Sequence, residues 1–451
     1  MKRMLSLVTF LLTSYVAVVA QPLKTLPHQA DEYLRSAKAA YRFNGVALMA
    51  HRGEVILHKA YGFAQVSRPT PNDTSTRFPI LSVTKSFTSA LVLKLQEQGK
   101  LSVEDKLSKY LPDFPHSHQI KLHHLMNHTS GLFNYTELID EEDSTIVCHP
   151  ISRQLFFDLM QDKPLAFTPG KQFSYNNSGY FLLGLVIEQA TGKPYEQAMR
   201  ELIFQPLGMN HSGFDYLNLP AGARAFGYDT LTSTHVSAYP HPDSTVLYAA
   251  GGIYSTARDL FQWARAVAAK QLLAEKTWKQ AFKEGYGWQT GTYENKGYVR
   301  HSGGYPGFMA EFIYYPTEDL TIILLNNFGT YTDSIFPIVM DLSSMAFGKP
   351  YDLWQERKEV ELSQNELESY VGTYRLNKKY AIDIVVRQGR LYALGHTSGQ
   401  MPELALHATS PGHFFVWTFN NYVTFKKKAS GEVSGFVLRE HGKDSTWEKV
   451  K

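Results

Sequence analysis

Phe78-Pro79-Ile80-Leu81-Ser82-Val83-Thr84-Lys85-Ser86-Phe87 is the segment of this 451-residue chain with the clearest chemical signal. It places Ser82 where a helix begins and Lys85 three residues later. A helix brings residues i and i+3 onto one face with Cβ atoms roughly 5–6 Å apart, so the Lys85 amine can reach the Ser82 hydroxyl. The first helical turn also leaves backbone N–H groups free at the positive end of the helix dipole. The Ser82 amide can therefore face developing negative charge.

The residues that follow predict a buried helix. Ala90, Leu91, Leu93 and Leu95 lead to Gly99, which gives an apolar helix with a glycine at its end. Taken alone, Ser-x-x-Lys also has a purely structural interpretation, in which Ser82 caps the helix and Lys85 is solvated. The rest of the chain distinguishes between these two interpretations.

The composition is that of a globular chain. Hydrophobic residues make up 43% and charged residues 19%, which is enough apolar material for a large core and too little net charge for disorder. The net charge is only +3, and the basic run Lys426-Lys427-Lys428 is not interleaved with aromatic residues. We therefore expect no nucleic-acid partner. Cys148 is the only cysteine, so no internal disulfide forms, and we interpret it as structural.

The N-terminal segment has the pattern of an export signal. Lys2 and Arg3 precede an apolar run from Leu5 to Val19, and Ala20 provides a small residue before Gln21. This predicts a secretory signal peptide over residues 1–20 and a secreted, periplasmic protein. An uncleaved membrane anchor is the alternative, although the run is short for a span. No other segment is apolar enough to cross a bilayer, so we expect no integral membrane span after signal cleavage.

Strand patterns at both ends of residues 21–350 predict one α+β domain. Residues 45–50 and 55–60 form a strand-turn-strand pattern, and residues 310–315 and 320–326 add strands after a helical middle. N- and C-terminal strands of this domain are therefore expected to share one antiparallel sheet.

Three other segments differ in composition from the strands and helices of this domain. Residues from about 135 to 170 are polar and are expected to form an irregular surface excursion near the cleft. Residues 351–361 are polar and charged and are interpreted as a linker. After the linker, a small β-barrel or sandwich is predicted over residues 362–451. Its five expected strands, separated by Gly, Asn or Ser turns, are residues 380–386, 390–394, 414–419, 422–426 and 433–440.

Acyl transfer by a serine requires a base, a proton donor, and two N–H groups that stabilise the oxyanion. Lys85 is the candidate base, with a pKa lowered by burial. Tyr175 is the candidate that shares the proton with Lys85, either as a phenolate base or as a general acid to the leaving group. The N–H groups of Ser82 and Gly304 are the candidates for the oxyanion hole.

The remaining candidates contact the substrate. The side-chain amide of Asn177 can bond both a substrate carbonyl and Lys85. The strand His301-Ser302-Gly303-Gly304 carries two residues without Cβ atoms, which lets substrate approach the backbone. Each motif alone also has an ordinary structural explanation, such as a packed tyrosine or a strand histidine. Their joint occurrence at the edges of suitable elements favours catalysis.

These motifs resemble the active-site motifs of the serine β-lactamase and penicillin-binding-protein superfamily, most closely the class C β-lactamase-like serine hydrolases. The resemblance covers roughly residues 30–347 and extends to His128-Thr129-Ser130-Gly131-Leu132, Pro169-Gly170 and Gly252-Ile253-Tyr254-Ser255-Thr256. It implies an antiparallel sheet flanked by helices, with an all-helical lobe and the serine helix between them. Residues from Tyr370-Val371-Gly372-Thr373-Tyr374 onward are similar to the lipocalin-like β domains that often follow such hydrolases.

One departure from the family's pattern bears on the substrate. Dedicated β-lactamases and many penicillin-binding proteins have lysine in the third motif, where this chain has His301. Imidazole is largely neutral near pH 7 unless a partner raises its pKa, so strong binding of a substrate carboxylate is not expected. Family members with histidine here are commonly esterases and D-amino-acid peptidases or amidases. The resemblance therefore implies hydrolysis of an ester or amide, in a small molecule or a peptide that includes peptidoglycan-derived ones, by an esterase, D-amino-acid peptidase or D-Ala-D-Ala carboxypeptidase-like enzyme.

Two alternatives stay open on the same fold. One is a slowly acylating or non-catalytic penicillin-binding-type sensor, and the other is a true β-lactamase. An α/β-hydrolase is excluded because the chain contains no Gly-x-Ser-x-Gly. No cofactor and no metal are expected, since His123 and His124 are adjacent and point to different helix faces.

Overall fold

The computed structural model describes residues 24–137, 149–330, 334–395 and 403–450. Contacts divide the chain into two compact units, one of residues 43–331 and one of the residues up to 42 and from 332 onward. The expected signal peptide, residues 1–20, and Cys148 lie outside the described residues. Among the helices that are described, none is both long and apolar enough to cross a membrane.

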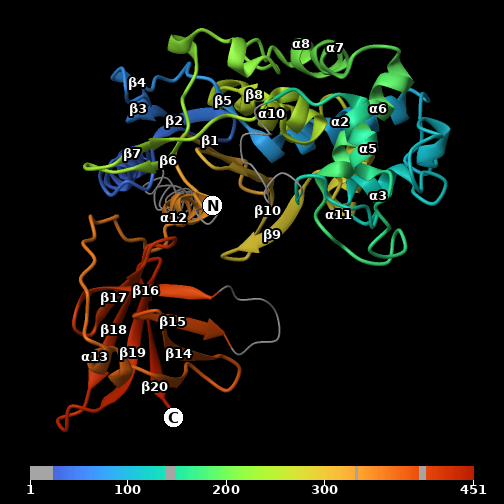
Figure 1. Ribbon diagram of the computed structural model, residues 1–451. Coiled ribbons are helices and arrows are strands. Elements are labelled where there is room, and N and C mark those ends of the chain that lie inside the picture. The colour runs from blue at the N-terminus through green and yellow to red at the C-terminus, as the bar shows by residue number, and fades with distance from the viewer. Residues whose placement is uncertain (1–23, 138–148, 331–333, 396–402, 451) are drawn as a thin grey trace, which may run out of the picture. The chain divides into compact units, whose positions relative to one another are not determined.

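The unit of residues 43–331 is built on a six-stranded antiparallel sheet with the strand order β2-β1-β12-β11-β10-β9 (Figure 1). Strands from the two ends of the unit share this sheet, as predicted, and β1 pairs directly with β12 from Gly45 opposite Asn326 to His51 opposite Leu320. Every residue of β11 and β12 is buried, as in a sheet whose central strands are covered on both faces. The strands are β1 (Gly45–His51), β2 (Glu54–Tyr61), β9 (Gln289–Tyr293), β10 (Lys296–Tyr305), β11 (Phe308–Tyr315) and β12 (Leu320–Asn326).

Helices form a lobe beside this sheet, in which α2, α3, α5 and α6 lie close together (Figure 1). Helix α2 (Thr84–Glu97) is buried at every position from Thr84 to Leu93, because it packs against both α6 and α9. Helix α10 instead packs on β1 and β12. The other helices are α3 (Leu122–Met126), α5 (Arg153–Met160), α6 (Asn177–Thr191), α7 (Tyr195–Met199), α8 (Gln205–Leu207), α9 (Ser244–Gly251), α10 (Ala257–Ala268) and α11 (Glu275–Glu284).

Short elements connect the lobe to the sheet. Two-residue to four-residue strands pair as β3 (Phe63–Gln65) with β4 (Thr70–Pro71), β5 (Phe78–Pro79) with β8 (Tyr254–Ser255), and β6 (Tyr228–Leu231) with β7 (Val236–Ala238). Single helical turns are η1 (Leu81–Val83), η2 (Leu107–Lys109), η4 (Arg200–Phe204), η5 (Tyr216–Asn218) and η6 (Ala221–Ala223).

The prediction of an irregular excursion over residues 135–170 is wrong for helix α5. Ser152 caps this helix, because its hydroxyl accepts a hydrogen bond from the N–H of Leu155. Only Phe156 and Met160 are buried, four residues apart on one face. The helix was not predicted because so few of its positions reach the core.

The second unit contains a closed barrel of eight antiparallel strands (Figure 1). This decides between the two predicted architectures in favour of the barrel. The apolar runs predicted five of its strands, whereas β13, β16 and β20 were not predicted; in β20 a single residue, Trp447, is buried. The strands are β13 (Gly372–Arg375), β14 (Ala381–Arg387), β15 (Arg390–Gly395), β16 (Leu404–Ser410), β17 (His413–Val416), β18 (Asn421–Lys427), β19 (Val433–Glu440) and β20 (Lys443–Lys449).

A helix at residues 24–39, α12 (Phe336–Ala346) and α13 (Gln364–Ser369) belong to the same unit as the barrel. The Tyr33 hydroxyl donates to the Asp341 carboxylate at 2.6 Å and accepts from Trp354 Nε1 at 2.7 Å. The Arg357 guanidinium donates to two backbone carbonyls of the barrel, at 2.9 and 3.2 Å. The segment of residues 351–361, which the sequence suggests is a linker, is thus anchored by the hydrogen bonds of Trp354 and Arg357.

Candidate active site

Ser82 lies in the turn η1, between strand β5 and helix α2. The turn is fixed from outside, because β5 pairs with β8 and the N–H of Ile80 donates to the Ile253 carbonyl at 2.9 Å. Leu81 has a φ of 50°, in the left-handed region that a leucine rarely adopts. A strained residue next to a serine at a helix start is typical of functional sites.

The Lys85 amine is surrounded by three oxygen atoms. Nζ lies 2.9 Å from Ser82 Oγ, 2.8 Å from Asn177 Oδ1 and 2.7 Å from the carbonyl oxygen of Ala250. The side chain is fully buried, and this burial lowers the pKa of Lys85 well below its ordinary value of 10.5. Lys85 is therefore not a solvated lysine, and none of the groups bonded to its amine carries a negative charge.

Tyr175 stands beside this amine. Its ring centre lies 5.0 Å from Lys85 Nζ, and its other neighbour is the ring of His128, with centroids 4.4 Å apart. Burial of its hydroxyl end raises the pKa of the Tyr175 phenol above its ordinary value of 10, although the residue as a whole is 38% exposed, and a hydrogen bond with Ser82 opposes this rise only in part. The phenol is therefore protonated at neutral pH.

Asn177 is the first residue of α6. The preceding Asn176 caps the helix, because its side chain accepts from the N–H of Gly179 at 2.9 Å. The Asn177 Oδ1 accepts from Lys85, and its Nδ2 donates to Thr136 Oγ1 at 3.1 Å. The amide orientation is fixed from both sides, which keeps its oxygen directed at the Lys85 amine.

His301, on β10, is a buried neutral imidazole. It is only 3% exposed, and its Nδ1 lies 2.7 Å from the carbonyl oxygen of Ser302. A carbonyl can only accept, so Nδ1 carries the proton and Nε2 keeps a lone pair. Burial, reinforced by the charge of Lys85, lowers the pKa of His301 to about 3. At neutral pH this residue brings no positive charge to the site.

Beside His301, strand β10 has an open edge. β9 pairs with β10 only as far as Arg300 opposite Gln289, so beyond that point this edge has no strand partner in the part of the chain that is described. The two glycines differ in their surroundings. A Cβ on Gly303 would lie 2.2 Å from the Ile80 carbonyl oxygen, whereas one on Gly304 would meet no atom within 4 Å. Gly303 lets the strand pack against the turn of Ser82, and Gly304 leaves room for substrate.

Replacing these glycines is expected to have opposite consequences for stability. Gly303→Ala forces the Ile80 backbone away, and such overpacking typically costs about 1–3 kcal/mol. The matched variant Gly304→Ala adds the same methyl group in open space and should leave the free energy of unfolding unchanged. Urea unfolding followed by circular dichroism measures both. Equal midpoints for the two variants would mean that η1 does not pack on β10 as described.

A cavity of about 250 Å³ opens beside Tyr175 and His301. Its wall combines the aromatic residues Phe173, Phe282 and Trp288 with polar side chains. Tyr175 itself is 38% exposed, so its ring is accessible from this space. Small-molecule sites typically span about 300–1,000 Å³, so a cavity of this size suits a single side chain or a short acyl group.

Two contributors to the site are not among the residues predicted from sequence. The Ala250 carbonyl accepts from Lys85 near the end of α9, where Tyr248 has a φ of 38°. A backbone carbonyl has no side-chain signature, and only the following Gly251-Gly252 hints at it. His128 supports the Tyr175 ring and accepts the Asn176 N–H at its Nδ1, 3.1 Å away. The sequence 128–132 belongs to the family resemblance but predicts no role for His128.

Metal-ligating side chains do not cluster in the described part of the chain. Within residues 24–137, 149–330, 334–395 and 403–450, no group of three or more His, Cys, Asp or Glu side chains could hold a metal ion. The expectation that His123 and His124 point apart is wrong: their rings lie edge to face with centroids 4.3 Å apart, and His124 turns back to accept the N–H of Lys121 at its Nδ1.

Comparison with known proteins gives two family matches. A family model described as Beta-lactamase matches residues 30–334, and one described as a domain of unknown function (DUF3471) matches residues 356–449. A penicillin-binding protein of Bacillus subtilis (strain 168) is 29% identical over 441 residues, which are 91% of this chain and 96% of the relative.

Solved structures share the fold. A penicillin-binding protein from Bacillus halodurans superposes with a TM-score of 0.60 and 28% identity, covering 69% of this chain and 99% of its own. A D-amino acid amidase from Ochrobactrum anthropi SV3, complexed with L-phenylalanine, superposes with a TM-score of 0.61 and 23% identity, covering 71% of this chain and 97% of its own. The second likeness concerns the fold alone.

Proposed function

The chain belongs to the β-lactamase family, within the superfamily of serine β-lactamases and penicillin-binding proteins, and from this premise we propose that it hydrolyses an ester or amide through an acyl-enzyme on Ser82. The observation that carries the proposal is the set of contacts around Lys85 Nζ. A neutral amine has two N–H donors and one lone pair. The oxygens of Asn177 and Ala250 accept the two donors, which leaves the lone pair for the Ser82 hydroxyl proton.

In acylation, Ser82 Oγ attacks the substrate carbonyl carbon while Lys85 Nζ takes the hydroxyl proton. The carbonyl electron pair moves onto oxygen, and the N–H groups of Ser82 and Gly304 stabilise the resulting charge. The low pKa of Lys85 makes its neutral form available near neutral pH. Burial favours the neutral amine, which is the form that acts as a base. No carboxylate is bonded to the amine, so no negative charge stabilises the ammonium form against this effect.

Tyr175 completes proton transfer to the leaving group. Because burial raises its pKa, the phenol starts protonated and serves as the acid instead of as a phenolate base. Its O–H donates to the departing oxygen or nitrogen, and the Lys85 ammonium returns a proton to the phenolate, which lies next to it. Water then attacks the acyl carbon while Lys85 accepts a proton from it, and the Lys85 ammonium returns that proton to Ser82 Oγ as the bond between Oγ and the acyl carbon breaks.

The neutral state of His301 supports the proposal that the enzyme does not bind its substrate through a carboxylate of that substrate. Its pKa of about 3 leaves it uncharged throughout the physiological range. Phe173 and Trp288 form an aromatic wall of the cavity, which favours a substrate whose acyl group is apolar and bulky. We therefore favour esters and D-amino-acid amides, the second class being what the amidase with this fold is named for. Peptidoglycan-derived peptides are a further substrate class within the same chemistry.

The direct test is turnover by the purified protein without residues 1–20. We expect many turnovers of p-nitrophenyl butyrate and of D-phenylalanine amide, and little of a cephalosporin. A burst of one product molecule per enzyme, followed by no further release, would instead favour the sensor on the same fold. Rapid cephalosporin hydrolysis would favour a true β-lactamase.

His301→Lys is expected to shift specificity towards substrates that carry a carboxylate. A charged hydrogen bond contributes about 1.5–3 kcal/mol, so KM for a cephalosporin should fall by roughly tenfold or more. The KM for p-nitrophenyl butyrate, which has no carboxylate, should change little and serves as the control. Parallel changes for both substrates would show that position 301 does not face the substrate's acidic group.

We also propose that the protein is exported to the periplasm. The apolar run from Leu5 to Val19, preceded by Lys2 and Arg3, supports this. N-terminal sequencing of the protein recovered from the periplasm should begin at Gln21. Recovery only with an intact Met1 would argue for the uncleaved anchor.

A further inference from the structure

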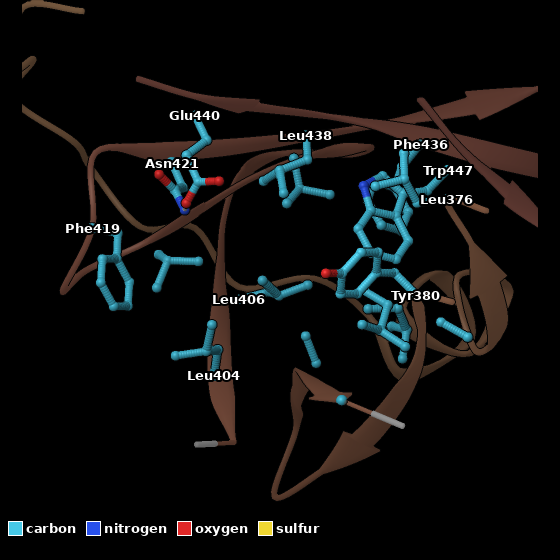
Figure 2. A pocket seen from close by; sticks show the side chains of 17 residues that line it. Leu376, Tyr380, Leu404, Leu406, Phe419, Asn421, Phe436, Leu438, Glu440 and Trp447 are labelled. Carbon is cyan, nitrogen blue, oxygen red and sulfur yellow. Dashed lines mark hydrogen bonds between the residues drawn. The ribbon is translucent and has the colours of Figure 1, made fainter. Parts of the chain in front are cut away.

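The barrel encloses an apolar cavity that is separate from the residues proposed to carry catalysis. Its volume is about 420 Å³, and Figure 2 shows its wall. Leu404, Leu406, Phe436, Leu438 and Trp447 give it a largely hydrocarbon surface. Eight-stranded barrels are wide enough for side chains to fill the interior or for one small ligand to enter. Here a volume in the range of small-molecule sites is left unfilled.

The cavity exists because small residues occupy inward positions of β14 and β15. Ala381, Ala393 and Gly395 line it, where larger side chains would fill it. In register, Ala393 lies opposite Leu404, which also faces inward. The next pair, Tyr392 opposite Ala405, points to the other face of the sheet, because side chains alternate along a strand.

The two ends of the cavity differ in polarity. At one end, Asn421 Nδ2 donates to Glu440 Oε1 at 3.0 Å, so the Glu440 carboxylate already has a partner. Towards the other end, the Tyr380 hydroxyl points inward in the direction of Leu406 (Figure 2). Lys379 Nζ lies 5.2 Å from the Tyr380 ring centre, and Tyr380 itself is 42% exposed. A hydroxyl donor thus lines an accessible part of the apolar cavity, and an ammonium group that is not itself part of the lining lies beside the ring of that residue.

We propose that the barrel binds a single-chain anionic amphiphile, a long-chain carboxylate, with its alkyl chain in the cavity and its carboxylate at Tyr380 and Lys379. Apolar cavities of this kind remain dry and take up apolar molecules. The Tyr380 hydroxyl and the Lys379 ammonium complement an anionic head. Glu440 repels the same head at the opposite end, so the two ends together set the orientation of the ligand.

The test is isothermal titration of the full-length Ser82→Ala protein with sodium dodecanoate below its micelle concentration. We expect saturable binding of one equivalent. Ala393→Phe fills the cavity and should weaken binding by about tenfold or more, since the added ring occupies the volume that the alkyl chain would take. Ala405→Phe makes the same substitution on the outward face of the neighbouring strand and should bind like the parent protein.

Leu404→Trp fills the cavity from the neighbouring strand and keeps the test valid if Ala393→Phe fails to fold, which circular dichroism reports. Absence of saturable binding, or equal affinity in the filled and the Ala405→Phe variants, would overturn the proposal. Dodecyltrimethylammonium has the same tail and the opposite charge. It should bind more weakly than dodecanoate, and Lys379→Glu should reduce that difference. Tighter binding of the cation would overturn the placement of the carboxylate.

Discussion

Ser82→Ala is expected to abolish turnover of p-nitrophenyl butyrate and of D-phenylalanine amide. Without the hydroxyl there is no nucleophile, while the oxyanion donors and Lys85 remain in place. Removing the nucleophile from a comparable serine hydrolase leaves only what binding and the oxyanion hole provide, so kcat should fall by roughly 10⁴-fold or more. Initial rates measured at saturating substrate, with product release followed spectroscopically, give this value.

The matched control is Ser86→Ala, one helical turn further along α2. Ser86 is buried, but its hydroxyl donates to the Val83 carbonyl at 2.8 Å and contacts no other group of the site. This variant should keep the parent rate. If both alanine variants lost activity equally, or if Ser82→Ala kept it, the nucleophile would lie elsewhere.

Lys85→Arg is expected to stop acylation without removing positive charge. A guanidinium cannot be deprotonated in a protein, so it cannot take the Ser82 proton. Loss of a general base typically costs about 10²–10⁴-fold in rate. Stopped-flow measurement of the acylation step with p-nitrophenyl butyrate reports this loss. The control is Lys94→Arg on the same helix, where the lysine contacts only the Leu272 carbonyl at 3.4 Å.

The pH dependence follows from the same amine. Acylation needs neutral Lys85, and the neutral fraction rises with pH through the pKa of Lys85 in the folded protein. Because burial lowers that pKa well below 10.5, kcat/KM should rise with pH and level off below the range where an exposed lysine loses its proton. Lys85→Arg should lack this rise. A rate that keeps increasing up to the ordinary lysine pKa would contradict the burial of the amine.

The contact between Ser82 and Lys85 in the candidate site could be predicted from the sequence, because it depends on side chains in a fixed local setting. Ser82 and Lys85 are three residues apart at a helix start, and the glycines at 303 and 304 mark a strand with little side-chain bulk. The strand patterns at residues 45–50 and 320–326 also predicted two strands that share one sheet, although not that β1 pairs directly with β12. A continuous apolar run suffices to predict strands such as β1 and β12, which are buried on both faces.

Features that depend on backbone groups and on pairing between distant segments could not be predicted from the sequence. The Ala250 carbonyl that accepts from Lys85 could belong to any residue type, and the end of β9 pairing at Arg300 is set by register. Gly303 meets Ile80 only after folding brings β10 to the turn of Ser82. Sequence spacing reports none of these contacts, because the partners are far apart along the chain.

The barrel shows the same limit. Apolar runs revealed five of its strands, but β20, with Trp447 as its one buried residue, has no such run. The cavity is lined by Ala393 and not by Ala405. The sequence does not tell these two alanines apart, because they lie in similar neighbouring strands. Side chains alternate between the two faces of a strand, but this shows which alanine faces the barrel interior only once the register of β15 and β16 is known.

The claim that Ser82 carries the acyl group is tested most directly by mass spectrometry of the protein quenched in acid during turnover of p-nitrophenyl butyrate. The account predicts one added butyryl group, found on the peptide that contains Ser82 and absent from Ser82→Ala. Steady turnover with Ser82 unmodified in every quenched sample, or a butyryl group on another residue that persists in Ser82→Ala, would contradict it.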